Sequence, residues 1–217
     1  MTEYRYHLPS GEGIPSVTEV LHRNLGWDTE TLMNVAMDVG KGLRFIKREA
    51  ADVGTLVHAY AAKMLCNKDP GEELPEIRSR IEGRLSRALS SLHAWVGSTD
   101  FVPIWAEERV VNEGLRVGGT PDLYGLLNGR RAVIDLKTGR EYASHRCQIA
   151  AYATRLVMDV RNELVEDVAI VYLGKSEDDA GTFKQHVFDV ADRRITAGLE
   201  AFDLALKLEH LRAEALR

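Results

Sequence analysis

The sequence contains only two cysteines, Cys66 and Cys147, in 217 residues. They lie far apart and match none of the spacings that bind zinc or an iron–sulfur cluster. Because such clusters are usually held by four thiolates, two cysteines exclude a cluster held by cysteine alone. We expect both side chains to be buried, reduced thiols.

The sequence also lacks any uninterrupted apolar run of the ~18 residues that a membrane-spanning helix needs. Residues 1–7 have no apolar segment of the kind found in secretory signals. No Gly-x-x-x-x-Gly-Lys-[Ser/Thr] loop is present, so any motor of that type would have to be a separate protein. We therefore expect a cytoplasmic protein with no membrane partner.

The sequence also has no excess of basic residues, and its formal net charge is −5. Affinity for nucleic acid would have to come from local clusters of positive charge. Arg80, Arg84 and Arg87 form one such cluster, because their spacing puts them on one face of a helix. A stripe of this kind is either a solvated helix face or a phosphate-binding surface.

What is present is an ordinary globular composition, with 45% hydrophobic and 28% charged residues. The length fits a single domain over residues 1–217. The periodic segments predict an α/β fold with a mixed central sheet flanked by helices. Residues 1–98 should be mainly helical, and residues 99–217 should hold the sheet core, the site and a C-terminal helix.

Helical periodicity and capping signals place the helices. Ser16 and Glu19 have the spacing of a capping box, which predicts a helix that ends by Gly26. Further helices are expected over residues 28–39, about 42–67, 76–96, about 144–160 and 191–217. Strands are expected over residues 104–111, 115–127, 131–137, 168–173 and 183–190, the first three forming an antiparallel meander.

The most informative stretch is a predicted hairpin around Asn128-Gly129, a pair typical of tight turns between strands. The turn folds Asp135 back towards Asp122. Side chains alternate along a strand, so Asp135 and Lys137 point the same way while Leu136 points into the core. Two carboxylates and one ammonium group should therefore surround one small volume.

Two close carboxylates repel each other unless a divalent cation lies between them, and oxygen ligands suit Mg²⁺ or Mn²⁺. A cation with open positions and a nearby lysine can activate water and stabilise charge on a phosphoryl oxygen. Hydrolysis of a phosphodiester is the natural reaction. The alternative for Asp122, Asp135 and Lys137 alone is a surface salt bridge on an ordinary hairpin.

Other candidate residues are ambiguous when each is taken alone. His58 lies on a largely apolar helix, where a histidine is either a packed core residue or a ligand. Glu107 and Glu108 point to opposite sides of a strand, so one can face the site and the other solvent. Gln148 and Tyr152 share a helix face, either as a surface amide and a half-buried ring or as a functional pair.

The order of these residues resembles the RecB-like branch of the PD-(D/E)xK nuclease superfamily over roughly residues 50–175. Members of that branch have a restriction-endonuclease-like fold. Residues 14–18 also resemble the start of many small phage-encoded members. The matching segments are Gly54-Thr55 with His58, Glu107, Gly119-Thr120-Pro121-Asp122, Asp135-Leu136-Lys137-Thr138-Gly139, and Gln148 with Tyr152.

The resemblance implies a role for each matching residue. Asp122, Asp135, the Leu136 carbonyl and His58 would bind Mg²⁺ or Mn²⁺, and Lys137 would orient the attacking water. Glu107 would hold a second metal or a metal-bound water, with Glu108 as the alternative. Related proteins carry four cysteines around an iron–sulfur cluster, which this sequence lacks. Gln148 and Tyr152 would contact the DNA backbone near the scissile phosphate, with the basic residues Arg80, Arg84 and Arg87 as further phosphate contacts.

The expected function is a metal-dependent deoxyribonuclease, more specifically an exonuclease that processes DNA ends in phage or bacterial recombination and repair. DNA is the expected partner, together with a recombinase, single-strand-binding protein or helicase supplied separately. For a phage-encoded protein the compartment would be the host cytoplasm. Two alternatives stay open: a non-catalytic DNA-binding module of the same fold, and an endonuclease specific for branched or structured DNA.

Overall fold

The computed structural model describes residues 4–27, 43–71 and 73–216, without the side chains of residues 43–47 and 80. The helix expected over residues 28–39 lies outside the described residues. In the described ranges, no helix is both long and apolar enough to cross a membrane.

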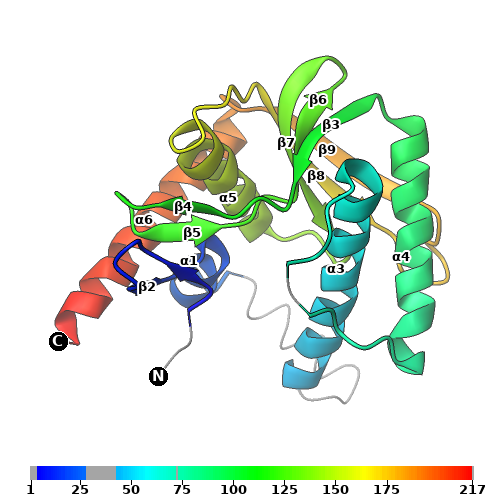
Figure 1. The fold of residues 1–217 in the computed structure, drawn as a ribbon, viewed down its shortest axis with the longest axis horizontal. Coiled ribbons are helices and arrows are strands. Elements are labelled where there is room, and N and C mark those ends of the chain that lie inside the picture. Colours follow the sequence, from blue (N-terminus) through cyan, green and yellow to red (C-terminus); the bar gives the residue numbers. More distant parts are fainter. Residues whose placement is uncertain (1–3, 28–42, 72, 217) are drawn as a thin grey trace.

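A five-stranded mixed sheet forms the centre of the molecule, in the order β3-β6-β7-β8-β9 (Figure 1). Neighbouring strands are antiparallel except β7 and β8, which are parallel. The expected antiparallel meander is therefore confirmed as β3, β6 and β7. The strands are β3 (Phe101–Ala106), β6 (Leu123–Leu127), β7 (Arg130–Lys137), β8 (Asp167–Leu173) and β9 (Phe183–Asp189).

Helices cover both faces of this sheet and enclose two hydrophobic cores (Figure 1). One face packs against α3 (Leu43–Cys66) and α4 (Ser79–Ser98). The other face packs against α1 (Val17–Asn24), α5 (Ala143–Ala151) with the π-helical segment η1 (Tyr152–Met158), and α6 (Arg193–Ala215). The predicted fold class, a mixed sheet flanked by helices, is confirmed.

Strand β8 shows why its sequence is apolar at nearly every position. Val168, Ile170 and Tyr172 face the core under α5 and α6. Ala169, Val171 and Leu173 alternate with them and face α3 and α4. All seven residues are buried, because a central strand covered on both faces has no solvent side.

The hairpin between β6 and β7 forms as predicted. Its turn residues Asn128 and Gly129 have φ angles of 52° and 79°, the left-handed values that a two-residue hairpin turn of this type needs. The register pairs Leu123 with Ile134 and Leu127 with Arg130. This register sets the residues before β6 beside the end of β7.

Two predicted strands are shorter than the sequence suggested. The strand expected over residues 104–111 ends at Ala106, because Glu107 turns the chain with a φ of 51°. The strand expected over residues 115–127 is interrupted at Pro121, a residue without a backbone N–H to donate. The other parts of these two segments form short strands, β4 (Val110–Asn112) and β5 (Val117–Gly119), which pair with each other in a separate small sheet.

Two helices also differ from their predicted extent. The helix expected from residue 76 begins at Ser79, and the side chain of Ile77 is exposed rather than part of the apolar stripe. The helix expected over residues 144–160 is α-helical only to Ala151 and continues as η1. Periodicity reports a buried face and does not distinguish α from π winding.

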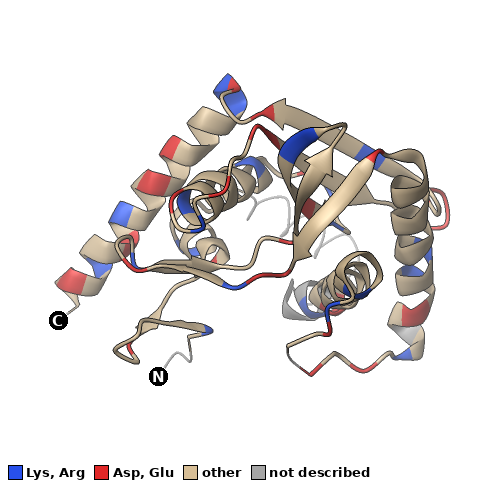
Figure 2. Cartoon of the chain, turned by 45° about the horizontal axis from the view of Figure 1, so that its top comes forward, with Lys and Arg blue, Asp and Glu red and all other residues tan. Residues whose placement is uncertain are grey.

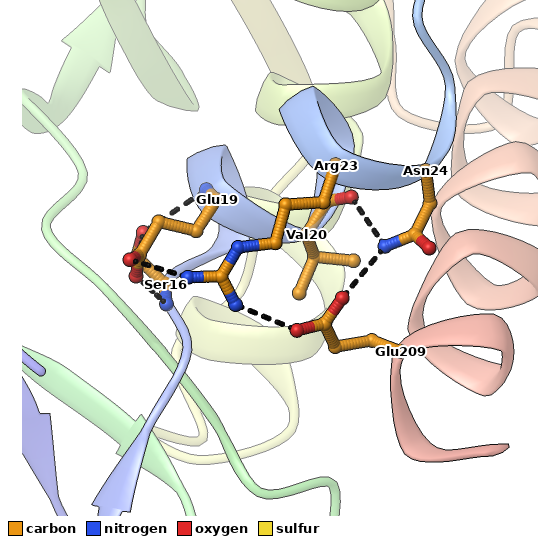
Figure 3. A network of polar contacts seen from close by, with 6 residues as sticks. All are labelled: Ser16, Glu19, Val20, Arg23, Asn24 and Glu209. Atoms are coloured by element: carbon orange, nitrogen blue, oxygen red, sulfur yellow. Dashed lines mark hydrogen bonds and ion pairs between the residues drawn. The ribbon is translucent and has the colours of Figure 1, made fainter. Parts of the chain in front are cut away.

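A network of polar contacts joins the N-terminal helix α1 to the C-terminal helix α6 (Figure 3). Ser16 and Glu19 form the predicted capping box at the start of α1. Arg23 Nη1 lies 2.6 Å from Glu209 Oε1, and Asn24 Nδ2 donates to Glu209 Oε2 over 3.0 Å. This network holds α1 against α6. Before α1, strands β1 (Tyr6–His7) and β2 (Gly13–Ile14) pair with each other in a two-stranded antiparallel sheet.

Candidate active site

Asp122 and Asp135 are brought together by the hairpin. Asp122 comes directly before β6, and Asp135 lies in the second half of β7. The backbone N–H of Leu136 donates to Asp122 Oδ2 over 2.6 Å. Both carboxyl groups are buried, so the chain holds two acids close together away from bulk water.

Lys137 points to the same side as Asp135, as the strand alternation predicted. Its Nζ lies 2.6 Å from Asp135 Oδ2, and its side chain is 16% exposed. Burial nevertheless raises the pKa of Asp135 to about 6, because desolvation of the carboxylate outweighs the attraction of the Lys137 ammonium. Asp122 adds its charge in the same upward direction.

His58 lies on α3, and its side chain contacts the carboxylates near the end of β7. A Cβ added at Gly54, one turn earlier, would lie 3.8 Å from Thr138 Oγ1, so the helix passes close to the end of β7. His58 Nδ1 is 3.5 Å from Asp122 Oδ1 and 3.5 Å from Glu107 Oε1. Its Nε2 lies 2.9 Å from the carbonyl oxygen of Leu136.

The surrounding carboxylates control the protonation of His58. Burial by itself lowers the pKa of the imidazole, but the charges of Asp122 and Glu107 more than reverse this and raise it to about 9. For Asp122, burial has the opposite effect and raises the pKa of the carboxyl group, while the positive charge of His58 partly opposes this rise. The histidine is therefore protonated at neutral pH and compensates part of the negative charge.

The structure distinguishes the two glutamates that the sequence left as alternatives. Glu107 faces His58, and its backbone N–H donates to the carbonyl oxygen of Asp122 over 2.9 Å. Glu108 turns away and lies 2.7 Å from Lys68 Nζ. The left-handed turn at Glu107 separates the directions of the two side chains.

The donor atoms of this cluster fit a divalent cation. His58, Glu107 and Asp122 each offer one ligand atom, and these atoms lie within 4.8 Å of one another. Among the described residues, Asp135 Oδ1 has no hydrogen-bond partner although it is fully buried. A hydrogen bond from Nε2–H to the Leu136 carbonyl would leave Nδ1 of a neutral His58 directed at the carboxylates.

Gln148 and Tyr152 lie on consecutive turns beside the acid pair. Gln148 Nε2 is 3.2 Å from the Tyr152 hydroxyl. Burial raises the pKa of Tyr152, and the charges of Asp122 and Asp135 raise it further.

The three arginines predicted to bind phosphate lie on α4, where Figure 2 shows basic and acidic segments interspersed. Arg84 Nη2 donates to Glu49 Oε2 over 3.0 Å, which links α4 to α3. Arg87 Nε donates to the carbonyl oxygen of Lys175 over 2.9 Å. The side chain of Arg80 lies outside the described residues.

The structure adds contacts that the sequence did not suggest. The hydroxyl of Tyr6 lies 2.7 Å from Thr120 Oγ1, which ties the N-terminal segment to the residues before Asp122. Tyrosine rings closely approach two glycines before Asp122: a Cβ at Gly118 would lie 2.4 Å from Tyr6 Cγ, and one at Gly119 would lie 2.8 Å from Tyr152 Cε1. No local motif signals the Tyr6 contact, since 114 residues separate the partners.

Comparison with known proteins gives one match that spans the chain: the model of the PD-(D/E)XK nuclease superfamily matches residues 3–216. A search of curated proteins finds no match. Among solved structures, the alkaline exonuclease LHK-Exo from Laribacter hongkongensis aligns over 77% of this chain and 92% of its own, with 12% identity and a TM-score of 0.33. LHK-Exo in complex with dAMP aligns over 78% and 92%, with 12% identity and a TM-score of 0.31. Likeness at this level carries no argument about the site.

Proposed function

The chain belongs to the PD-(D/E)XK nuclease superfamily, and from this premise we propose that it is a Mg²⁺- or Mn²⁺-dependent exonuclease that hydrolyses phosphodiester bonds at DNA ends. The observation that carries the proposal is the convergence of Asp122, Asp135 and Lys137 at the end of β7, with His58 and Glu107 facing them. The acids and the lysine expected for this chemistry are all present, which argues against a non-catalytic module.

We assign the cation to His58, Glu107, Asp122 and Asp135. When bound, it would supply positive charge to a phosphoryl oxygen and help to lower the pKa of the attacking water. Lys137, held by Asp135, would orient that water and neutralise the charge that develops on the phosphate. The Leu136 carbonyl, predicted from sequence as a further ligand, would alternatively accept a hydrogen bond from His58 Nε2 and fix the imidazole.

Substrate contacts are proposed for residues around this centre. Gln148 lies on the helix beside the acid pair and is half-buried, so its amide can reach a DNA phosphate. Tyr152 supports Gln148 through its hydroxyl. Arg84 and Arg87 would add phosphate contacts on α4 beside their internal ones, and Arg80 completes the same proposed set.

We expect the purified protein to degrade linear DNA in Mn²⁺ or Mg²⁺ and to lose this activity in EDTA, because two buried carboxylates need a cation between them. Labelled single- and double-stranded linear substrates measure the activity. A closed circular substrate should stay intact, since an exonuclease needs an end. Cleavage of the circle would favour the endonuclease alternative, and DNA binding without hydrolysis in any divalent cation would favour the non-catalytic one.

The affinity for Mn²⁺ should increase with pH. The pKa of His58 is raised to about 9, so a cation that binds at pH 7 must displace a proton from Nδ1. Release of one proton makes affinity rise by up to about tenfold per pH unit until the pH reaches that pKa. Isothermal titration calorimetry at several pH values measures the affinity, and buffers of different ionisation enthalpy count the protons.

A His58→Asn variant is the control for this pH dependence. It should bind Mn²⁺ more weakly and lose most of the slope between pH 7 and pH 9, because the titrating ligand is gone. An equal slope in the variant and the unaltered protein would contradict the assignment of His58 as a ligand.

A further inference from the structure

A cavity of about 220 Å³ lies beside the candidate active site, between the first turn of α5 and strands β8 and β9. Four of its lining residues carry rings: Tyr142, Tyr172, His186 and Phe188. Pockets for drug-sized ligands begin at roughly 300 Å³, so this cavity is suited to a single ring system.

The sheet register connects the cavity to the acid pair. Ile170 is the partner of Asp135 across β7 and β8, and His186 is the partner of Ile170 across β8 and β9. Tyr172 is the partner of Lys137. Partners in register leave the sheet on the same face, and two strand spacings place His186 about 10 Å from Asp135 along that face.

Ring contacts hold the walls of the cavity in place. Tyr172 and His186 meet edge to face, with centroids 5.9 Å apart, and His186 stacks on Phe188 at 6.2 Å. Tyr142 meets His145 edge to face at 5.3 Å, and His145 Nδ1 lies 3.0 Å from the Tyr172 hydroxyl. The aromatic surfaces are therefore ordered before any ligand arrives.

The charges around the cavity suit an anionic ligand. Glu141 lines the cavity, but its carboxylate lies 2.5 Å from Lys184 Nζ, which compensates its charge, and 3.0 Å from His186 Nε2. Arg146 adds a guanidinium group to the lining at the first turns of α5. A phosphate attached to the ligand would thus meet positive charge at the rim.

From this juxtaposition we propose that the cavity binds one unpaired nucleobase of the DNA strand whose backbone lies at the acid pair. The proposal rests on the proposed nuclease function, because it assumes DNA in the neighbouring site. Stacking on aromatic side chains accepts every base, so the cavity selects strand state rather than sequence. A base stacked within a duplex cannot enter, and the preferred substrate is a single strand or a frayed end.

An abasic scan in a Lys137→Ala background, carried out in EDTA, tests this without hydrolysis. A labelled oligothymidylate, with one nucleotide at a time made abasic, is titrated by fluorescence anisotropy. One position should weaken binding by about 5- to 150-fold, the range expected for the loss of one stacked base. Adding Tyr142→Ala should reduce this abasic penalty to less than about twofold.

Matched variants keep the test decisive. Tyr142→Phe preserves the ring and should retain the penalty, and His186→Ala on the opposite wall should lose it even if Tyr142→Ala does not fold. Tyr60→Ala removes a partly exposed tyrosine that contacts His93 on the α3–α4 side, and it should leave the penalty unchanged. An equal penalty in the background, Tyr142→Ala and His186→Ala proteins overturns the proposal, as does the absence of DNA binding.

The two proposals fail separately. A protein that degrades DNA but shows no ring-dependent penalty remains a nuclease and has no base site in the cavity. A protein that shows the ring-dependent penalty but hydrolyses no DNA in any divalent cation has the base site without the proposed activity.

Discussion

Replacing Lys137 by alanine is expected to lower kcat for DNA hydrolysis by about 10²- to 10³-fold, the contribution typical of a group that stabilises charge developing in the transition state. The ammonium lies 2.6 Å from Asp135 Oδ2 and is mostly buried, so neither water nor another described lysine can easily take its place. Initial rates on a labelled linear substrate at saturating Mn²⁺ measure the effect. Undiminished cleavage would refute the assignment of the active site.

Two controls separate lost chemistry from lost structure. Lys63 is a matched lysine on α3 that also pairs with an aspartate, since its Nζ lies 2.8 Å from Asp69 Oδ1. Both of these side chains are largely exposed, so Lys63→Ala should change the rate by less than about twofold. The Lys137→Ala protein should still be stabilised by Mn²⁺ in a thermal melt, because the carboxylates remain.

The centre of the site was predictable because its geometry is local. Asn128 and Gly129 define a turn type, and the turn fixes the register of β6 and β7. Strand alternation then places Asp135 and Lys137 on one side. Each of these steps depends on residues a few positions apart, where backbone conformation is dictated mainly by the chain itself.

The remaining features depend on tertiary structure. The different directions of Glu107 and Glu108 follow from a left-handed turn at Glu107, whose backbone contacts Asp122 and Lys68, residues distant in the sequence. The contact between Tyr6 and Thr120 joins segments that are distant in the sequence. The aromatic cavity combines a helix start with two strands, and no periodicity within one segment reports such a combination.

Replacing Asp135 by asparagine is expected to stabilise the protein in EDTA while it abolishes hydrolysis. Burial raises the pKa of Asp135 from 3.8 to about 6 in the folded state. A carboxyl group with a raised folded pKa opposes folding above its unfolded pKa: the penalty is absent below about pH 4, grows up to about pH 6 and then stays constant. At pH 7 its removal should increase the free energy of unfolding by on the order of 3 kcal/mol, measured by urea denaturation.

The same measurement at pH 4 should show a much smaller difference between the Asp135→Asn and unaltered proteins. At that pH the carboxyl group is neutral in the folded state and only about half ionised in the unfolded state, so most of the penalty is absent. Asp167→Asn is the matched control: Asp167 is also buried, but it accepts hydrogen bonds of 2.7 and 3.0 Å from Arg130. Its loss should destabilise the protein by about 1 to 3 kcal/mol.

Mn²⁺ at a hundredfold excess over its Kd should stabilise the unaltered and Asp167→Asn proteins by about 2.7 kcal/mol, and Asp135→Asn far less. Equal destabilisation by both substitutions would show that Asp135 supports the fold rather than a cation.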